Sequence, residues 1–244
     1  MEKEKSYQEY LKKMTFGTKG SIKNRFYELA RKNPLLYRKY LKLINWQVNK
    51  LHLIPDIATA NHILDIGVGS GLTLNYIAEF MNKSAKLFGI DLNKNELLPG
   101  HIKFAECNIE TEVLPFENNS MDIVITTFVL EHLRDPYMLF QEANRVLKKG
   151  GYLYVVTENY ITTILPDYWN FWADPTHVRP YTKRSLSTLA EGTGFEVFKT
   201  GVIRTAEFII FSPLFPILNL LSDSNFSFMP FEIFGRSVYL IAKK

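Results

Sequence analysis

The sequence has a single cysteine, Cys107, among its 244 residues, which excludes a disulfide within the chain. It also has no long apolar run, because the longest one, residues 208–221, contains Pro213 and Pro216 and is shorter than the ~20 residues of a membrane-spanning helix. No apolar segment typical of a secretory signal follows the N-terminus. We therefore expect a cytoplasmic protein with at most peripheral membrane contact.

Two ligand-binding motifs are missing as well. The histidines have neither an i+4 partner nor the carboxylate spacing of a metal centre, so no metal site is predicted. They are His52, His62, His101, His132 and His177. The phosphate-binding pattern G-x-G-x-x-G is also absent, which disfavours an NAD-binding oxidoreductase.

The net charge of +4 is distributed unevenly along the chain. Residues 1–54 carry 13 Lys and Arg against four Glu, a balance of +9, so the remaining 190 residues balance at −5. The basic side chains of this segment can be read in two ways. They either form the solvated face of ordinary helices, or they attract a phosphate-bearing acceptor or an anionic membrane surface. Confinement of the charge to one terminal segment argues against a nucleic-acid partner.

The most informative stretch is residues 62–72, where a short apolar strand meets three alternating glycines, Gly67, Gly69 and Gly71. Apolar residues with helical spacing follow directly, so the stretch predicts a strand, a tight turn and a helix. Glycines allow the sharp turn and the close approach of a ligand, and the free N–H groups at a helix start favour an anionic group. A small ligand is expected here.

Two carboxylates accompany this loop. Asp65 stands two residues before Gly67, and a second strand, residues 86–91, ends in Asp91, whose carboxylate can accept two hydrogen bonds from a ribose diol. With these residues, the region from about 60 to 200 resembles the class I S-adenosylmethionine-dependent methyltransferases of the small-molecule, lipid and glycan type.

The resemblance implies S-adenosyl-L-methionine as cofactor and S-adenosyl-L-homocysteine as product. Asp65 and the glycines would face the methionine end, Asp91 the ribose, and Asn108 the adenine, although Asn108 stands where the family has an acid. The residues assigned to the cofactor in this way are Asp65, Gly67, Val68, Gly69, Gly71, Asp91, Leu92, Asn108, Ile109, Thr127 and Phe128.

Apolar runs predict strands at residues 62–66, 86–91, 102–106, 122–127, 152–157, 195–200 and 237–243. Helices are predicted after Gly71, from the Asp135 N-cap to Gly150, and from the Thr182 N-cap to Gly192. This order predicts an α/β fold with a Rossmann-like, doubly wound sheet. The resemblance implies seven strands, the last antiparallel and inserted beside the fifth.

We expect two domains. Residues 1–54 form an N-terminal helical lid, whose aromatic side chains either face a substrate or simply dock the helices. Residues 55–244 form the methyltransferase domain, with a substrate loop at 158–182. Residues 206–234 hold seven of the 18 phenylalanines and form either an apolar cap over the sheet or a membrane-touching surface, and the sequence favours the cap.

Candidate catalytic residues follow the fourth strand and lie in the substrate loop. Glu131 and His132 resemble a recurrent family pair, and His132 is either catalytic or a packing residue. The loop string from Asp174 to Thr182 resembles one in methyltransferases of bacterial glycan and natural-product pathways. His177 is the first candidate base and His132 the second.

The same loop is rich in aromatic side chains that suit stacking on sugar rings. Its candidate acceptor-binding residues are Tyr168, Trp169, Trp172, Arg179 and Tyr181. His177 and Arg179 either touch the acceptor or hold the loop to the core.

The resulting hypothesis is methyl transfer to oxygen of a small-molecule, glycan or lipid-linked acceptor. The alternative is a non-catalytic regulator or partner subunit that binds S-adenosylmethionine.

Overall fold

The computed structural model describes residues 46–165, 170–204, 210, 212–214, 217 and 234–244. The chain divides into two compact units, residues 1–45 and 46–244, and the description below concerns the second. The lid helices expected before residue 46, the loop residues Tyr168 and Trp169, and most of the apolar cap lie outside the described residues. None of the helices in the described part is long and apolar enough to cross a membrane.

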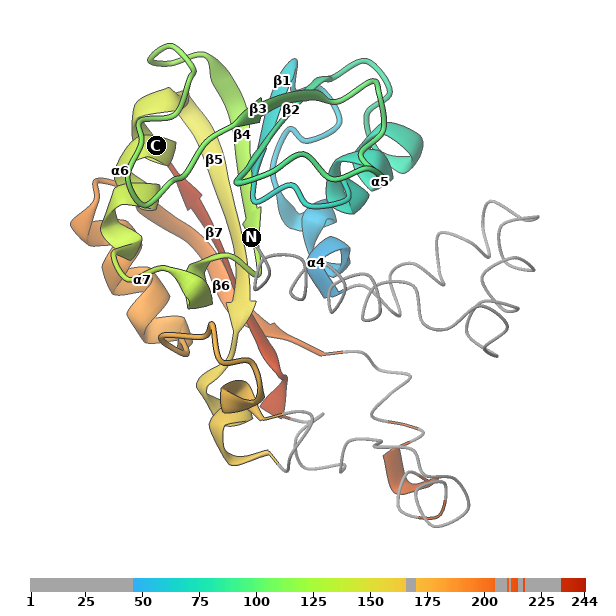
Figure 1. Ribbon diagram of the computed structural model, residues 1–244, viewed down its shortest axis with the longest axis vertical. Helices are drawn as coiled ribbons and strands as arrows, with labels where there is room; N and C mark the ends of the chain where they lie inside the picture. The colour runs from blue at the N-terminus through green and yellow to red at the C-terminus, as the bar shows by residue number, and fades with distance from the viewer. Residues whose placement is uncertain (1–45, 166–169, 205–209, 211, 215–216, 218–233) are drawn as a thin grey trace. The chain divides into compact units, whose positions relative to one another are not determined.

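The core of the second unit is a seven-stranded sheet of order β3-β2-β1-β4-β5-β7-β6 (Figure 1). Its strands are β1 His62–Ile66, β2 Lys86–Asp91, β3 Lys103–Glu106, β4 Met121–Thr127, β5 Leu147–Glu158, β6 Glu196–Ile203 and β7 Ser237–Lys243. Strands β1 to β5 pair in parallel, whereas β7 is antiparallel to both β5 and β6. The expected α/β fold, with the last strand inserted beside the fifth, is confirmed.

Helices cover both faces of this sheet, as expected for parallel strands whose two faces are apolar. Helices α4 (Trp46–Asn49) and α5 (Leu72–Phe80) lie on one face, and α6 (Pro136–Val146) and α7 (Lys183–Gly192) on the other (Figure 1). Fully buried side chains pack between the sheet and the second pair of helices. They include Leu64, Val124, Phe140, Val155, Leu186 and Leu240.

The helix starts form as their sequences predict. The Asp135 carboxylate accepts the N–H of Tyr137 at 3.0 Å, and Pro136 occupies the first helical position. At α7, the Thr182 hydroxyl accepts the N–H of Ser185, and the Ser185 hydroxyl accepts the N–H of Thr182 in return.

The end of α6 differs from the prediction. The helix ends at Val146, and residues 147–151 are extended as the start of β5. Leu147 pairs with Met121, and the Lys148 ammonium contacts Asp122 Oδ1 at 2.6 Å. Pairing with the neighbouring strand therefore outweighs the helical pattern of the local sequence.

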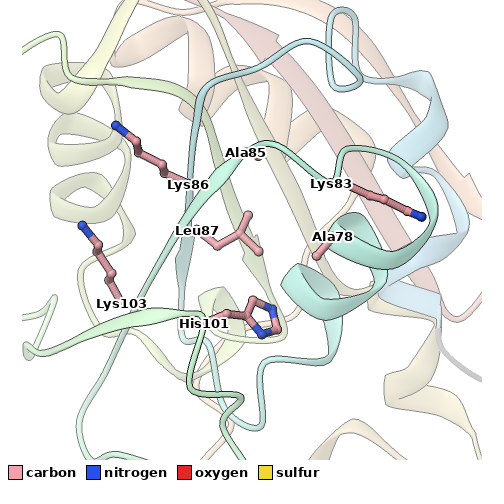
Figure 2. A pocket seen from close by; sticks show the side chains of 7 residues that line it. All are labelled: Ala78, Lys83, Ala85, Lys86, Leu87, His101 and Lys103. Atoms are coloured by element: carbon pink, nitrogen blue, oxygen red, sulfur yellow. The ribbon is translucent and has the colours of Figure 1, made fainter.

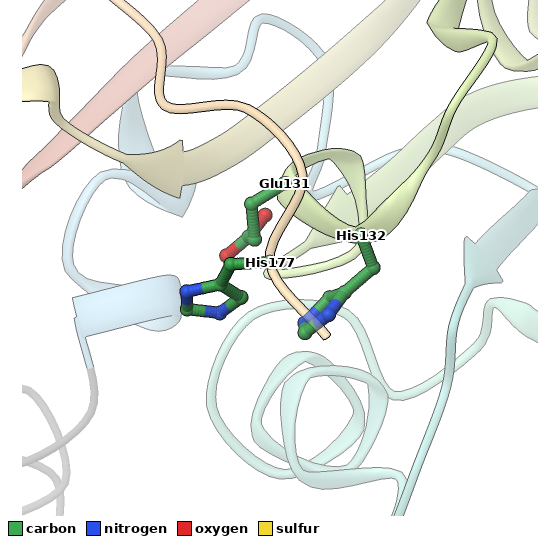
Figure 3. A group of neighbouring side chains, drawn as sticks. All are labelled: Glu131, His132 and His177. Carbon is green, nitrogen blue, oxygen red and sulfur yellow. The ribbon is translucent and has the colours of Figure 1, made fainter. Parts of the chain in front are cut away.

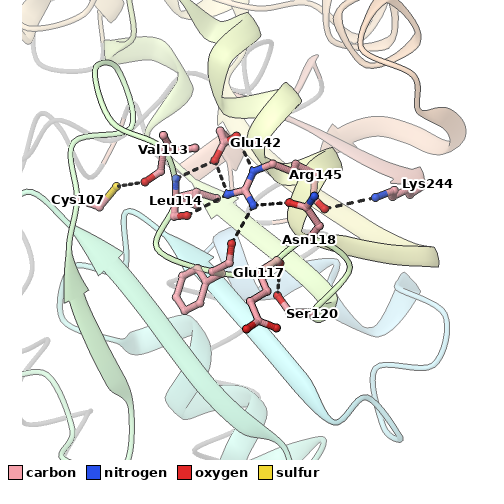
Figure 4. A network of polar contacts seen from close by, with 10 residues as sticks. Cys107, Val113, Leu114, Glu117, Asn118, Ser120, Glu142, Arg145 and Lys244 are labelled. Atoms are coloured by element: carbon pink, nitrogen blue, oxygen red, sulfur yellow. Dashed lines mark hydrogen bonds and ion pairs between the residues drawn. The ribbon is translucent and has the colours of Figure 1, made fainter.

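A polar network fixes the connection between β3 and β4 to helix α6 (Figure 4). The Arg145 guanidinium donates to the carbonyl oxygens of Leu114 at 2.9 Å and Phe116 at 2.8 Å, and pairs with Glu142 at 2.7 Å. Glu142 also accepts the N–H of Leu114 at 2.7 Å. The hydrogen bond from Arg145 lowers the pKa of the Glu142 carboxyl. This network fixes the segment that leads into β4, and the candidate site begins at the end of that strand.

Candidate active site

The glycine loop lies at the carboxyl end of β1, the side on which parallel sheets bind ligands. The N–H groups of Gly67 and Val68 both donate to the Ile90 carbonyl at 2.9 Å, which ties the loop to β2. All three glycines have positive φ angles, 77° at Gly67, 49° at Gly69 and 76° at Gly71. Side chains are strained in this left-handed region, so the turn needs these residues.

The three glycines differ in what surrounds them. A Cβ atom on Gly67 would overlap the side chain of Val129, and one on Gly71 would lie 2.8 Å from methyl carbons of Leu98 and Ile102. Apart from its chain neighbours, no described residue has an atom within 4 Å of a Cβ atom placed on Gly69. Gly67 and Gly71 therefore permit close packing within the protein, whereas Gly69 borders open space.

Asp65 and Asp91 lie beside this loop. Asp65 is 1% exposed, and its Oδ1 atom is buried with no hydrogen-bond partner among the described residues. Burial, and then the nearby negative charge of Asp91, raise the pKa of Asp65 well above its usual value. Asp91 accepts the N–H of Gly69 at 2.9 Å and of Leu92 at 2.7 Å. A cationic ligand group next to Asp65 would stabilise its ionised form.

Further predicted cofactor residues border the same end of the sheet. Phe128 directly follows β4 and has a φ angle of 56°, and its N–H donates to Val156 at 2.9 Å. A positive φ at an aromatic residue is strained, and such strain clusters at functional sites. The Asn108 side-chain oxygen accepts the N–H of Glu110 at 3.0 Å, and Ile109 is buried. Asn108 thus shapes its own loop, and its oxygen keeps one lone pair for a ligand.

A second group of functional side chains comes from two segments far apart in the sequence (Figure 3). Glu131 and His132 belong to the short 3-10 turn Leu130–His132, and His177 follows the turn Phe171–Ala173. The two imidazole rings lie 4.7 Å apart between centroids. One possible ligand atom from each of the three residues lies within 4.8 Å of those of the other two. Because spacing along the chain cannot show this meeting, the sequence did not predict the cluster.

Hydrogen bonds fix the tautomers of both histidines. His177 Nδ1 lies 2.7 Å from the Phe171 carbonyl, which can only accept, so this nitrogen carries the proton. His132 Nδ1 lies 2.9 Å from the Thr176 hydroxyl, whose own proton is donated to Asp174 at 2.6 Å. His132 Nδ1 must therefore also donate. In the neutral form each ring keeps an Nε2 lone pair for another partner.

Carboxyl groups surround the cluster. Glu131 is 1% exposed and accepts the Thr157 hydroxyl at 2.7 Å. Burial, with an added contribution from Glu158 and Asp174, raises the pKa of Glu131 to about 8. The pKa of His132 is lowered, first by burial and then by His177. His132 is therefore neutral near pH 7.

The loop residues predicted to bind the acceptor divide into two groups. Trp172 is 58% exposed and packs edge-on against Phe171, and Arg179 is exposed. Tyr181 is only 3% exposed, belongs to the core, and its hydroxyl donates to the Leu130 carbonyl at 3.4 Å. Tyr181 is therefore not available for stacking, which corrects its predicted role. Tyr168 and Trp169 lie outside the described residues.

A basic pocket of about 420 Å³ lies elsewhere (Figure 2). Its polar lining residues are Lys83, Lys86, His101 and Lys103. Lys86 and Lys103 are the first residues of β2 and β3, so the pocket is at the opposite end of these strands from Asp91. It is separate from the glycine loop and the histidine cluster.

Comparison with known proteins places these features in a family. Residues 64–155 match a family described as a methyltransferase domain. A Mycolicibacterium smegmatis protein described as a probable S-adenosylmethionine-dependent methyltransferase is 29% identical over 57% of this chain and 53% of its own. A ubiquinone biosynthesis O-methyltransferase of Coxiella burnetii is 27% identical over 70% of this chain and 79% of its own.

Among solved structures, Haemonchus contortus phosphoethanolamine N-methyltransferase 2, in complex with S-adenosyl-L-methionine, superposes with a TM-score of 0.62 at 18% identity. The superposition covers 93% of this chain and 61% of that one. The chain spans about half the length of several curated relatives that it matches. The matched domain, these relatives and the sheet order show that the chain belongs to the class I S-adenosylmethionine-dependent methyltransferases.

Proposed function

We propose that the chain transfers a methyl group from S-adenosylmethionine to a hydroxyl oxygen of a small-molecule, glycan or lipid-linked acceptor. The observation that carries this proposal is the pair of imidazoles, His132 and His177, whose Nδ1 protons are fixed and whose Nε2 lone pairs are available. A hydroxyl needs a group that accepts its proton, and neutral histidine is the side chain best suited to that near pH 7.

The residues around the glycine loop fit the cofactor. Asp65 Oδ1, buried without a partner in the described residues, suits the ammonium group of a methionine moiety, and the open space at Gly69 admits the ligand. Asp91 holds the loop and keeps lone pairs for ribose hydroxyls. When bound, the cofactor supplies a methyl group on a positively charged sulfur, which is already electrophilic. The protein's remaining task is to orient the acceptor and remove its proton.

His177 is the first candidate for proton removal and His132 the second. The hydrogen bond from His177 Nδ1 to the carbonyl of Phe171, another residue of the loop, holds the ring in place and leaves Nε2 for chemistry. His132 is held in the same way by Thr176.

The choice of acceptor is supported by the loop and by a relative. Exposed Trp172 offers a flat apolar face for a sugar ring or another flat group. The Coxiella burnetii relative is described as an O-methyltransferase of ubiquinone biosynthesis, a small-molecule reaction. The excess of +9 in residues 1–54 favours an acceptor that carries phosphate.

Turnover and cofactor binding, measured on the same variants, test the proposal. His177→Ala should keep its affinity for S-adenosylmethionine by calorimetry and lose turnover about 10²–10⁴-fold on a hydroxyl acceptor. His101→Ala, an exposed histidine outside the site, serves as the control. Cofactor binding without turnover on any acceptor tested would support the alternative, a non-catalytic regulator or partner subunit. Unchanged turnover per molecule with lower thermal stability would limit His177 to loop anchoring.

A further inference from the structure

We propose that Glu131, His132 and His177 together bind one divalent first-row transition-metal ion. The three residues offer two imidazole nitrogens and one carboxylate oxygen, all within 4.8 Å of one another. Two histidines and a carboxylate are a recurrent ligand set for zinc and iron in proteins. The spacing of these residues along the chain does not indicate a metal site, and the fold alone brings them together.

The hydrogen bonds behind the two rings are those that metal-binding histidines require. A ligating imidazole donates its second N–H to a carbonyl, carboxylate or hydroxyl group, which fixes its tautomer and orientation. His177 donates Nδ1–H to the Phe171 carbonyl at 2.7 Å. His132 donates Nδ1–H to Thr176, whose hydroxyl donates in turn to Asp174 at 2.6 Å. Both Nε2 lone pairs are left for an ion.

The charge around the cluster also favours a cation. Glu131 is fully buried, and the structure records no Lys or Arg ion pair with it in the described part of the chain. Two more carboxyl groups, those of Glu158 and Asp174, act on it electrostatically. Asp174 Oδ2 lies 4.0 Å from His177 Nε2. These carboxyl groups would attract a divalent ion placed between the two imidazoles, while the positive charge of Arg236 also acts on Glu158.

The ligand types determine which class of ion is favoured, and the distances between the ligand atoms determine the movement that binding requires. Imidazole ligands favour Mn²⁺, Fe²⁺, Co²⁺ or Zn²⁺ over Mg²⁺ and Ca²⁺, which prefer oxygen ligands. An ion with bonds of about 2.1 Å holds neighbouring ligand atoms roughly 3 Å apart, so the three side chains must rotate inwards on binding. Three protein ligands leave coordination positions open for an oxygen of the acceptor.

The role of the ion, although not its binding, rests on the proposed function. An ion bound here would hold the acceptor oxygen and lower the pKa of its hydroxyl, so that the proton passes to solvent water instead of to His177. The ion would also select acceptors that offer a second oxygen within reach of the same metal.

The test measures metal binding without cofactor or acceptor. Chelator-stripped full-length protein is titrated with Mn²⁺, Zn²⁺, Co²⁺ and Mg²⁺ by calorimetry, and the Co²⁺ complex is followed by its visible absorption. We expect one transition-metal ion per chain and much weaker Mg²⁺ binding. His132→Ala and His177→Ala should each weaken metal affinity at least about 100-fold, whereas His101→Ala should not change it.

A milder variant keeps the test decisive if a ligand variant fails to fold. Thr176→Val removes the acceptor for His132 Nδ1–H at an exposed position, and should weaken metal affinity about 10–100-fold. Absence of metal binding by the wild type, or equal binding by the His132→Ala and His101→Ala variants, would overturn the proposal.

The two proposals can fail separately. Metal binding without turnover would support the ion site and count against the proposed function. Full turnover of chelator-stripped protein, with loss of turnover in His177→Ala, would remove the ion from the mechanism and support His177 as a base.

Discussion

The backbone N–H of Gly69 donates a 2.9 Å hydrogen bond to Oδ2 of Asp91, which joins the glycine loop after β1 to the end of β2. The other carboxylate oxygen of Asp91 accepts the N–H of Leu92 at 2.7 Å. Asp91 was predicted from the sequence as a ribose ligand, and the structure gives it a second task. It holds the loop in shape before any ligand arrives, so the loop is ordered in advance of binding.

Removal of the Asp91 carboxylate should therefore weaken cofactor binding in two ways. Asp91→Ala loses the predicted ribose contacts and also releases Gly69, and we expect a loss of about 1.5–3 kcal/mol in the binding free energy of S-adenosylmethionine. Asp91→Asn keeps one acceptor oxygen and should lose less. Calorimetry with S-adenosylmethionine and S-adenosylhomocysteine measures both effects. Wild-type affinity in Asp91→Ala would place the ribose elsewhere.

The glycine loop offers a matched pair of substitutions. Gly69→Ala adds a methyl group that meets no other described residue within 4 Å beyond its chain neighbours, so its cost to stability should be limited to the positive φ angle, about 1–2 kcal/mol. It should reduce cofactor affinity, because the methyl group enters the proposed ligand space. Gly67→Ala adds a methyl group that overlaps Val129 and should destabilise the fold severely. Thermal unfolding and calorimetry together distinguish the two.

The sequence predicted those features that depend on neighbouring residues. The strands that carry Asp65 and Asp91, the turn glycines, and the Asp135 and Thr182 caps all follow local rules and are present in the structure. The end of α6 was wrong because pairing of Leu147 with Met121 is a contact between distant segments. Local periodicity does not contain that information.

The candidate site was harder to predict for the same reason. His177 was selected for its place in an unusual loop, but its meeting with Glu131 and His132 depends on the packing of that loop on the core. Tyr181 was assigned to the acceptor because aromatic residues gather in the loop, yet its ring is buried in the core. Residue type shows what a side chain can do, and burial decides whether it can reach a ligand.

The network at Glu142 and Arg145 should make stability depend on acidity. The hydrogen bond from Arg145 lowers the pKa of Glu142 below its usual 4.5, so this carboxylate stabilises the fold above that pH. The contribution is lost as the pH falls through the lowered pKa. Arg145→Ala should cost about 1.5–3 kcal/mol of unfolding free energy at pH 7, because hydrogen bonds to a charged group are lost.

Urea denaturation at pH 7 and at pH 3 checks this prediction. The difference between wild type and Glu142→Gln should be largest at pH 7 and should shrink at pH 3, because below the usual pKa of 4.5 the unfolded chain binds a proton at Glu142 that the folded network resists. Cofactor affinity should change little in either variant, because the network lies between α6 and the β3–β4 connection and not at the glycine loop. An equal difference at both pH values would show that Glu142 acts through packing rather than charge.

Asp65 should make cofactor binding depend on pH, because its pKa is raised, whereas the pKa of Glu142 is lowered. Burial raises the pKa of Asp65, so ionising it costs free energy in the ligand-free protein, and stability falls as the pH rises from about 4 through the raised pKa. A bound ammonium group favours the ionised form, so affinity for S-adenosylmethionine should weaken as the pH falls below that pKa.

Asp65→Asn should bind the cofactor weakly, show a flatter pH profile between pH 5 and 8, and unfold no more easily than the wild type at pH 7. Calorimetry across this range, paired with thermal unfolding, separates loss of the charge from misfolding. An unchanged pH profile in Asp65→Asn would mean that another group binds the ammonium.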